Sequence, residues 1–275
     1  MPNNFVAHEA HFLKEVVLCP PQKEYFSVSD KKSHNITELA DREKAVLQHQ
    51  LLTELISKIG VNIIAIDELQ GHPNSVFTRD TALVTPKGFV KLRMGIDTRR
   101  GEEIWMANFL ESKGVPCVGV IEPPGTVEGG DIILAGSVAF VGNSSRTNKE
   151  GVTQISKLLS HQGYEVRVST VPSPFLHIGG AMSVIDSNTT LSVEGIFPND
   201  FFDKFVNISI PNNGFITGNV ITLGPQKLLA SRDNVAGIEI LSRQHFQVYD
   251  ADLSEFIKGT GGPSCLIMPL SRTST

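Results

Sequence analysis

The chain has 275 residues, 40% of them hydrophobic, which is enough to bury a sizeable core. Its net charge of −5 and the lack of a dense Lys/Arg stripe argue against a nucleic-acid surface. Three widely spaced cysteines make neither a disulfide framework nor a zinc site, no apolar run could span a bilayer, and no secretory signal is readable. We therefore expect a soluble, cytoplasmic protein without nucleic-acid or membrane partners.

Helix-like stretches and short β-rich segments alternate along the chain. In the helix-like stretches apolar residues recur at three- and four-residue spacing, as at Val152, Ile155 and Leu159. The predicted elements, in chain order, are a helix at 38–58, a strand at 61–66, a helix at 101–113, a strand at 118–121, a helix at 149–161, strands at 166–170 and 206–210, a helix at 233–243 and a strand at 248–250.

Paired apolar runs at 131–141, 182–193 and 220–229 indicate β-hairpins between these elements. The first two have Gly136-Ser137 and Ser187-Asn188 at their centres, which suit tight two-residue turns. The units recur roughly every 40 to 57 residues, and this spacing favours a radial or stacked repeat over a single open sheet. No linker interrupts the repeat, so we expect one domain over residues 1–275.

Polar residues interrupt the apolar strands at matching places in successive units. They are Asp80, Glu128 with Asp131, His177, Asn219 and Cys265. Glycine pairs flank several of them, and glycine allows a close approach of backbone that a Cβ would block. If the units surround an axis, these polar residues converge at one end of its channel.

Cys265, His177 and Glu128 together are the parts of a site with a thiol nucleophile. The thiolate is the reactive form, and a nearby imidazole can lower its pKa or carry a proton to a leaving group. A carboxylate beside the imidazole fixes its orientation. Taken singly, each residue has a plainer interpretation, as a core cysteine, a core histidine or a turn carboxylate. Their joint occurrence favours catalysis.

Five motifs resemble, in order, those of the guanidino-group-modifying enzymes. They are Asn74-Ser-Val-Phe-Thr-Arg-Asp80, Glu128-Gly-Gly-Asp131, Arg146-Thr-Asn148, His177 and Gly261-Gly-Pro-Ser-Cys265. In length and layout the whole chain resembles the dimethylarginine dimethylaminohydrolases, while details around Phe77 and after Cys265 are similar to arginine deiminase. The resemblance implies an α/β fold, the pentein, which is a five-bladed α/β propeller of ββαβ units and agrees with the repeat.

The resemblance also implies roles for individual residues. Cys265 would attack the guanidinium carbon to form a covalent thiouronium-type intermediate, His177 would protonate the leaving amine and then activate water, and Glu128 would position His177 and contact the guanidinium. Asp80 would supply negative charge to the guanidinium, and Arg99 and Arg146 would hold the substrate α-carboxylate. The implied substrate-binding residues are Asn35, Asn74, Phe77, Asp80, Arg99 and Arg146. Without the resemblance, both arginines would be taken as solvated surface residues.

The chain departs from the family pattern at four positions. Asn74 and Arg79 stand where dimethylarginine dimethylaminohydrolases usually carry an aspartate and a glutamate. Gly179 replaces an aspartate of the deiminases, and Asn35, in the loop expected to cover the substrate, is not apolar. Asn74 is instead similar to the arginine dihydrolases, so these departures leave the substrate open.

We therefore predict a hydrolase without cofactor or metal that acts on the guanidino carbon of arginine or an N-methylated arginine. The products would be citrulline and ammonia or an alkylamine, and the sequence leaves room for an oligomer. One alternative is an arginine deiminase, although the chain has no room for the usual helical insertion, or an arginine dihydrolase that forms ornithine and ammonia. An alternative of another class is a non-catalytic pentein that acts as a binding module.

Overall fold

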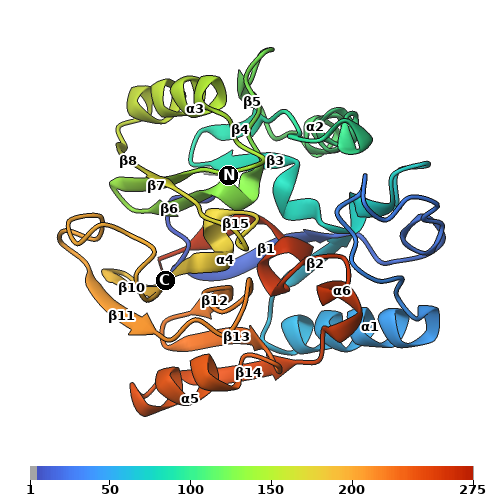
Figure 1. Cartoon of the computed structure of the whole chain (residues 1–275). Helices are drawn as coiled ribbons and strands as arrows, with labels where there is room; N and C mark the ends of the chain where they lie inside the picture. The colour runs from blue at the N-terminus through green and yellow to red at the C-terminus, as the bar shows by residue number, and fades with distance from the viewer. Residues whose placement is uncertain (1–4, 275) are drawn as a thin grey trace.

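Five three-stranded sheets form the core of residues 5–274, the part of the chain that the computed structural model describes. In each sheet, or blade, the middle strand runs antiparallel to one neighbour and parallel to the other. One blade consists of β6 (Ile132–Ala135), β7 (Val138–Asn143), α3 (Lys149–His161) and β8 (Glu165–Thr170). The long helices lie at the periphery and the strands towards the centre (Figure 1). This is the five-bladed propeller that the sequence predicts.

Two further blades have the same order of elements. They are β3 (Ala82–Thr85), β4 (Gly88–Lys91), α2 (Glu102–Ser112) and β5 (Cys117–Val120), and β12 (Val220–Gly224), β13 (Lys227–Ser231), α5 (Val235–Arg243) and β14 (Gln247–Ala251). Helix α5 begins at Val235 rather than at residue 233 because the Asn234 side chain accepts a hydrogen bond from the backbone N–H of Gly237.

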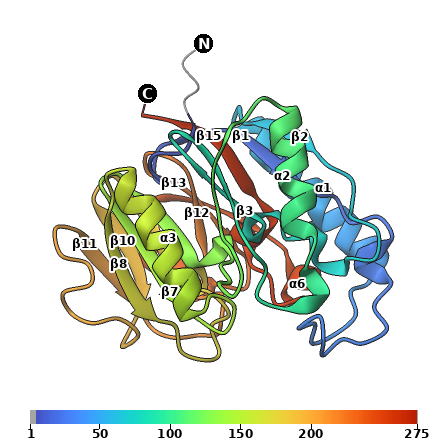
Figure 2. The same ribbon diagram turned by 90° about the horizontal axis from the view of Figure 1, so that it is seen from above.

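The two ends of the chain share one blade. Strand β15 (Met268–Thr273) runs antiparallel to β1 (Phe12–Leu18), which runs parallel to β2 (Asn62–Ala65). Figure 2 shows β15 and β1 side by side. This pairing closes the ring and brings the segment before β15, which contains Cys265, against the N-terminal part of the fold.

Helix α1 (Arg42–Lys58) crosses between β1 and β2 and begins later than the predicted residue 38. The Asp41 side chain accepts a hydrogen bond from the backbone N–H of Lys44 at 3.0 Å and caps the helix there. Residues before Asp41 belong instead to the loop that leads towards the candidate site.

The fourth blade, counted along the chain from β1, has an aromatic segment in place of a helix. Its strands are β9 (Met182–Asp186), β10 (Thr189–Val193) and β11 (Val206–Ile210), and the predicted turn at Ser187-Asn188 joins the first two. Phenylalanines between β10 and β11 pack on the neighbouring blade, with the Phe201 and Phe140 rings 5.2 Å apart. These aromatic rings bury the apolar area that a crossover helix covers in the other blades.

We call β3, β6, β9, β12 and β15 the inner strands of the five blades. Short helical turns precede four of them in the described chain. They are η3 (Thr78–Asp80) before β3, η5 (Gly129–Asp131) before β6, α4 (Ile178–Ala181) before β9 and η6 (Pro263–Leu266) before β15. The other short elements are η1 (Glu24–Phe26), η2 (Pro73–Val76), η4 (Asp97–Arg99) and α6 (Ser254–Ile257). Within residues 5–274, no helix is long and apolar enough to cross a membrane.

Candidate active site

The turns before the inner strands carry the predicted polar residues to one place. Asp80 ends η3, Glu128 directly precedes η5, His177 directly precedes α4, and Cys265 lies within η6. Asn219 directly precedes β12 in the remaining blade. Because each inner strand starts near the axis, the matching register in the sequence becomes proximity in the fold.

His177 lies between two carboxylates. Its Nε2 is 2.8 Å from Oε2 of Glu128, and its Nδ1 is 3.8 Å from Oδ1 of Asp80. Burial lowers the pKa of His177, but the negative charges of Asp80, Asp131 and Glu128 outweigh that effect and raise the pKa to about 9. The imidazole is therefore an imidazolium at neutral pH and can donate a proton.

Glu128 is fully buried and remains ionised because cationic groups surround it. Its Oε1 accepts hydrogen bonds from the backbone N–H of Gly95 at 2.9 Å and from Nη1 of Arg146 at 3.3 Å. Burial opposes ionisation, but His177, Arg146 and Arg99 hold the pKa of Glu128 well below its usual range. Its carboxylate thus fixes the histidine ring and balances the imidazolium charge.

Asp80 has one engaged and one unengaged carboxylate oxygen. Its Oδ2 accepts a hydrogen bond from Nη1 of Arg99 at 2.7 Å. Its Oδ1 is buried and has no hydrogen-bond partner among residues 5–274, and Nδ1 of His177 lies 3.8 Å from it. A buried acceptor without a donor is costly, so this oxygen is suited to the N–H groups of an incoming cation.

Cys265 lines a pocket of about 310 Å³ that His177 also lines. Apolar side chains of Leu176, Phe215 and Ile216 form another part of its wall. Burial of the thiol, together with the negative charge of Asp80, raises the pKa of Cys265 to about 12. The thiol is therefore protonated at neutral pH when the pocket holds no cation.

Asn219 connects the turn that carries the cysteine to the turn that follows the histidine. Its Oδ1 accepts the backbone N–H of Ser264 at 2.9 Å, while its Nδ2 donates to Ser264 Oγ at 2.7 Å and to the carbonyl of Gly179 at 2.9 Å. The sequence placed Asn219 in register with the catalytic candidates but assigned it no role. These contacts make it a positioning residue for Cys265.

The loop around Asn35 makes hydrogen bonds to two other segments, at Thr260 and at Asn74. Asn35, in the left-handed region with φ 55°, donates from Nδ2 to Thr260 Oγ1 at 2.9 Å. The neighbouring His34 has its Nδ1 3.2 Å from Oδ1 of Asn74, whose Nδ2 donates to the His34 carbonyl at 3.1 Å. Asn35 and Asn74 thus lie where the covering loop meets the rest of the fold. His34 was missed because nothing in the sequence pairs it with a residue 40 positions away.

Phe77 supports the cysteine loop from behind. Its buried ring packs against Gly259 and Gly261, and a side chain at either glycine would collide with it. It also meets Tyr25 edge-on, with ring centroids 6.0 Å apart. Among the described residues it is not part of the wall of the Cys265 pocket. Its contact with substrate stays a prediction.

Arg99 is buried and bonded within the protein, and its contact with a substrate α-carboxylate stays a prediction. Its Nη1 donates to Asp80 at 2.7 Å, and its Nε and Nη2 donate to Oε2 of Glu102 at 2.9 Å and 2.7 Å. Nη2 also contacts the carbonyls of Asn74 and Phe77 at 3.4 Å and 3.2 Å. Two buried carboxylates require this compensation, so the guanidinium is directed at Asp80 and Glu102 rather than held free for a substrate carboxylate.

Other arginine donors remain near Glu128. Arg146 is buried and bonded to Glu128, as described above. Nε and Nη1 of Arg100 are buried without a hydrogen-bond partner in the described part of the chain. Burial and the charge of Arg93 lower the pKa of Arg100. The sequence missed Arg100 because it reads as a surface residue at the start of a helix.

Asp80, Glu128 and His177 could supply three metal ligands, since their ligand atoms lie within 4.8 Å of one another. Arg99 Nη1, however, lies 2.7 Å from Asp80 and 3.7 Å from Glu128. Because a guanidinium already balances both carboxylates, the arrangement disfavours a metal cation.

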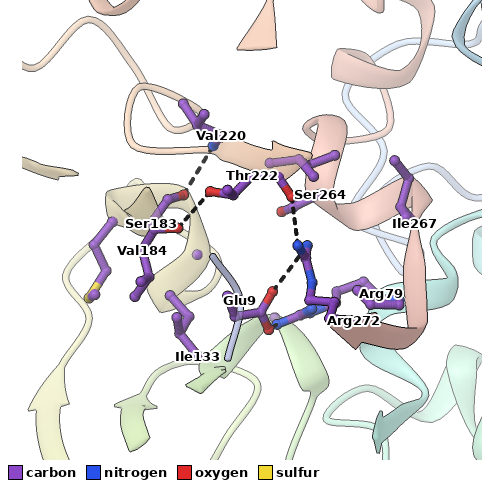
Figure 3. A pocket seen from close by; sticks show the side chains of 15 residues that line it. Glu9, Arg79, Ile133, Ser183, Val184, Val220, Thr222, Ser264, Ile267 and Arg272 are labelled. Carbon is purple, nitrogen blue, oxygen red and sulfur yellow. Dashed lines mark hydrogen bonds and ion pairs between the residues drawn. The ribbon is translucent and has the colours of Figure 1, made fainter. Parts of the chain in front are cut away.

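A second cavity is lined by the charged residues Glu9, Arg79 and Arg272 together with apolar and hydroxyl side chains (Figure 3). It shares Gly130, Gly179 and Ser264 with the Cys265 pocket. Arg79 lines this cavity and donates from Nη2 to Oε1 of Glu9 at 2.6 Å. Arg79 is therefore committed to an ion pair in the second cavity, although it is adjacent to Asp80 in the chain.

Comparison with known sequences shows the family of the chain. A family model described as N,N dimethylarginine dimethylhydrolase, eukaryotic, matches residues 22–272. The chain is 29% identical to the N(G),N(G)-dimethylarginine dimethylaminohydrolase of Pseudomonas aeruginosa, over 82% of this chain and 88% of that protein. It is 30% identical to an uncharacterized protein of Aeropyrum pernix, over 91% of this chain and 93% of that one.

Solved structures show the same architecture. The Pseudomonas aeruginosa dimethylarginine dimethylaminohydrolase, in complex with citrulline, superposes with a TM-score of 0.83 at 26% identity, covering 94% of this chain and 99% of that chain. The N-terminal domain of a cyanobacterial arginine dihydrolase, bound to product, has a TM-score of 0.82 at 19% identity, covering 94% and 98%. At that identity the second likeness shows the fold alone.

Proposed function

Because the chain belongs to the dimethylarginine dimethylaminohydrolase family, we propose that it hydrolyses a C–N bond at the guanidino carbon of arginine or an N-methylated arginine. The observation that carries the proposal is the position of His177, 2.8 Å from Glu128 and 3.8 Å from Asp80 in a pocket that Cys265 lines. The products would be citrulline and ammonia or an alkylamine.

Substrate binding prepares the nucleophile. The guanidinium donates to the unpartnered Oδ1 of Asp80 in charge-assisted hydrogen bonds. The negative charge of Asp80 helps to keep the Cys265 thiol protonated, and the bound cation offsets that charge. The thiol of Cys265 therefore loses its proton to solvent once the substrate is in place, because His177 is already protonated and cannot accept it.

The reaction then proceeds in two halves. Sγ of Cys265 forms a bond to the guanidinium carbon, the C–N bond breaks, and the His177 imidazolium gives its proton to the leaving amine. The neutral imidazole next takes a proton from water and the resulting hydroxide bonds to the carbon. The C–S bond then breaks, and the hydroxyl proton of the intermediate passes to the departing sulfur, which releases citrulline and restores the Cys265 thiol. Glu128 holds the imidazole in place through both halves.

The substrate α-carboxylate is proposed to bind Arg146 together with Arg100. Nε and Nη1 of Arg100 make no hydrogen bond among the described residues, and its Nε lies 3.9 Å from the exposed Asp97. Arg99 would have to release Asp80 or Glu102 to take part. We therefore assign Arg99 to the orientation of Asp80.

Two parts of the site favour different substrates. The polar covering loop, in which His34 and Asn35 meet Asn74 and Thr260, offers hydrogen-bond partners to an unmethylated guanidinium. This favours arginine, with a deiminase or dihydrolase reaction to citrulline or ornithine as the second candidate. The apolar wall of Leu176, Phe215 and Ile216 offers instead a surface for N-methyl groups.

Product analysis decides between these candidates. The purified protein is incubated separately with arginine, monomethylarginine and asymmetric dimethylarginine, and mass spectrometry identifies the amino acids and amines released. Citrulline with methylamine or dimethylamine indicates a methylarginine hydrolase, citrulline with ammonia a deiminase, and ornithine a dihydrolase. No product from any of the three would overturn the proposal and favour the binding-module alternative.

A further inference from the structure

We propose that Asp131 is a positioning residue that holds the backbones of His177 and Arg146 in place around Glu128. The inference rests on the proposed function, because it matters for catalysis only if those residues bind and process the substrate. Asp131 is fully buried and ends the Glu128-Gly-Gly-Asp131 motif, yet no step of the proposed reaction uses it.

One oxygen of Asp131 holds the histidine turn. Oδ1 accepts the backbone N–H of Ile178 at 2.9 Å, and Ile178 directly follows His177. His177 in turn places its Nε2 on Glu128, which lies three residues before Asp131 in the chain. The carboxylate thus ties the start of α4 to η5, so that the imidazole and the glutamate keep a fixed separation.

The other oxygen holds the arginine loop. Oδ2 accepts the hydroxyl proton of Ser144 at 2.6 Å. The same Ser144 Oγ accepts the backbone N–H groups of Arg146 at 3.0 Å and Thr147 at 3.2 Å. Thr147 Oγ1 accepts the backbone N–H of Glu128 at 3.1 Å, which closes the network. Asp131 therefore orders, through Ser144, the loop whose arginine bonds to Glu128.

The surrounding packing is built for an aspartate at this position. A Cβ at Gly142 would collide with Oδ1 of Asp131 and with the side chains of Val171 and Ile178. Burial is the main influence on the carboxyl group and raises the pKa of Asp131 to about 6. It is nevertheless ionised in the range where the His177 proton is exchanged, and its charge favours the imidazolium.

The groups that set the charge state of His177 come from all the turns packed around it. They are Asp80 of η3, Glu128 directly before η5, Asp131 of η5, Arg99 and Arg146 through their contacts with Glu128, and Cys265 of η6 across the pocket. Replacing Asp131 by asparagine removes one negative charge and leaves one acceptor oxygen in place of two, while the side chain keeps its size.

The first test measures the His177 titration directly and does not depend on turnover. The ring signals of His177 are followed by NMR against pH in the substrate-free wild type and in Asp131→Asn, with Ser144→Ala as a comparison. We expect Asp131→Asn to lower the His177 pKa by about one unit, the size typical of a nearby charge, and Ser144→Ala to leave it unchanged. An unchanged His177 pKa in a folded Asp131→Asn protein would overturn the proposal.

The second test uses steady-state kinetics to separate the contact of Asp131 with the histidine turn from its contact with the arginine loop. The substrate is the one among arginine, monomethylarginine and asymmetric dimethylarginine that the wild type turns over. Ser144→Ala loosens the Arg146 loop and is expected to raise KM about tenfold without moving the alkaline limb of the pH profile. Asp131→Asn is expected to move that limb to lower pH. Ser192→Ala, which removes a buried hydroxyl that accepts from Asn207 in the fourth blade, is the control.

Two outcomes contradict the role of Asp131 in this second test. If Ser144→Ala leaves KM at the wild-type value, the connection to Arg146 is wrong, even if Asp131→Asn fails to fold. If Ser144→Ala and Ser192→Ala change KM equally, the effect is general destabilisation. Absence of turnover in the wild type would instead reject the proposed function, and the NMR titration would still decide the positioning role.

Discussion

The charge on His177 is the residue-scale property on which the proposed chemistry depends most. An imidazole that has been buried among neutral groups loses its proton readily, whereas His177 keeps it because three carboxylates surround it. Burial of the thiol and the charge of Asp80, one of these carboxylates, make Cys265 a poor nucleophile until a cation enters. In the substrate-free site, His177 is thus protonated and can act as an acid, while the Cys265 thiol is also protonated and unreactive.

The raised pKa of His177 predicts a stability that depends on pH. The pKa is about 9 in the folded protein against 6.5 ordinarily, so protonation stabilises the fold fully below pH 6.5, and this stabilisation is lost as the pH rises through about 9. We expect the free energy of unfolding in urea to fall over that range in the wild type and to lack this fall in His177→Gln. Parallel curves for the two proteins would contradict the assigned charge.

The raised pKa of Cys265 predicts slow alkylation of the free enzyme. In a Cys117→Ser background, which removes the exposed thiol, the rate with iodoacetamide should rise about tenfold per pH unit between pH 7 and 9. The double variant with Cys265→Ser gives the background rate. A plateau near pH 8.5, as an ordinary thiol would give, would show that Cys265 is not held protonated.

At the scale of elements, the site depends on turns that are held together by side chains from other blades. Asn219, at the start of β12, links η6 to α4 through Ser264 and Gly179. We expect Asn219→Ala to lower kcat about 100-fold, because a displacement of about 1 Å costs that much in a positioned site. Asn207→Ala, which removes an amide bonded to Ser192 in the fourth blade, is the matched control. Equal loss in both variants would refute the positioning role of Asn219.

Local patterns explain which elements could be predicted. The hairpin turns at Gly136-Ser137 and Ser187-Asn188 lie where the sequence placed them, because turn chemistry acts over a few residues. The start of α1 was predicted too early because apolar spacing extends past the capping Asp41. The side-chain partners of Arg99 could not be predicted from the sequence, because Asp80 lies 19 residues away and only the fold brings the two residues together.

At the scale of the whole molecule, closure of the ring by β15 and β1 couples the two ends of the chain. Leu18 of β1 is fully buried in a cluster that includes Leu266 and Ile267 beside Cys265. We expect Leu18→Ala to lower the free energy of unfolding by about 2–5 kcal/mol. The exposed Leu51 of α1 offers the matched control, for which Leu51→Ala should change it by less than about 0.5 kcal/mol. A similar small effect at both positions would contradict a closed core.

The repeat made the site predictable as a whole, although not in its details. Asp80, Glu128, His177 and Cys265 converge because each lies at the short turn before an inner strand. This position is visible in the sequence as a polar residue near glycines in three of the four cases. The contact between His34 and Asn74 was not predictable, because it depends on how a loop folds over the ring.

The central claim is that Cys265 is the nucleophile of a guanidino hydrolase, and the rate of citrulline or ornithine release by Cys265→Ser tests it most directly. With the substrate that the wild type turns over fastest, we predict that Cys265→Ser releases no detectable product while keeping the wild-type circular dichroism and melting temperature. Cys117→Ser, an exchange of the same kind at an exposed thiol, should keep the wild-type rate. Product release by Cys265→Ser at a rate close to that of the wild type would contradict the mechanism.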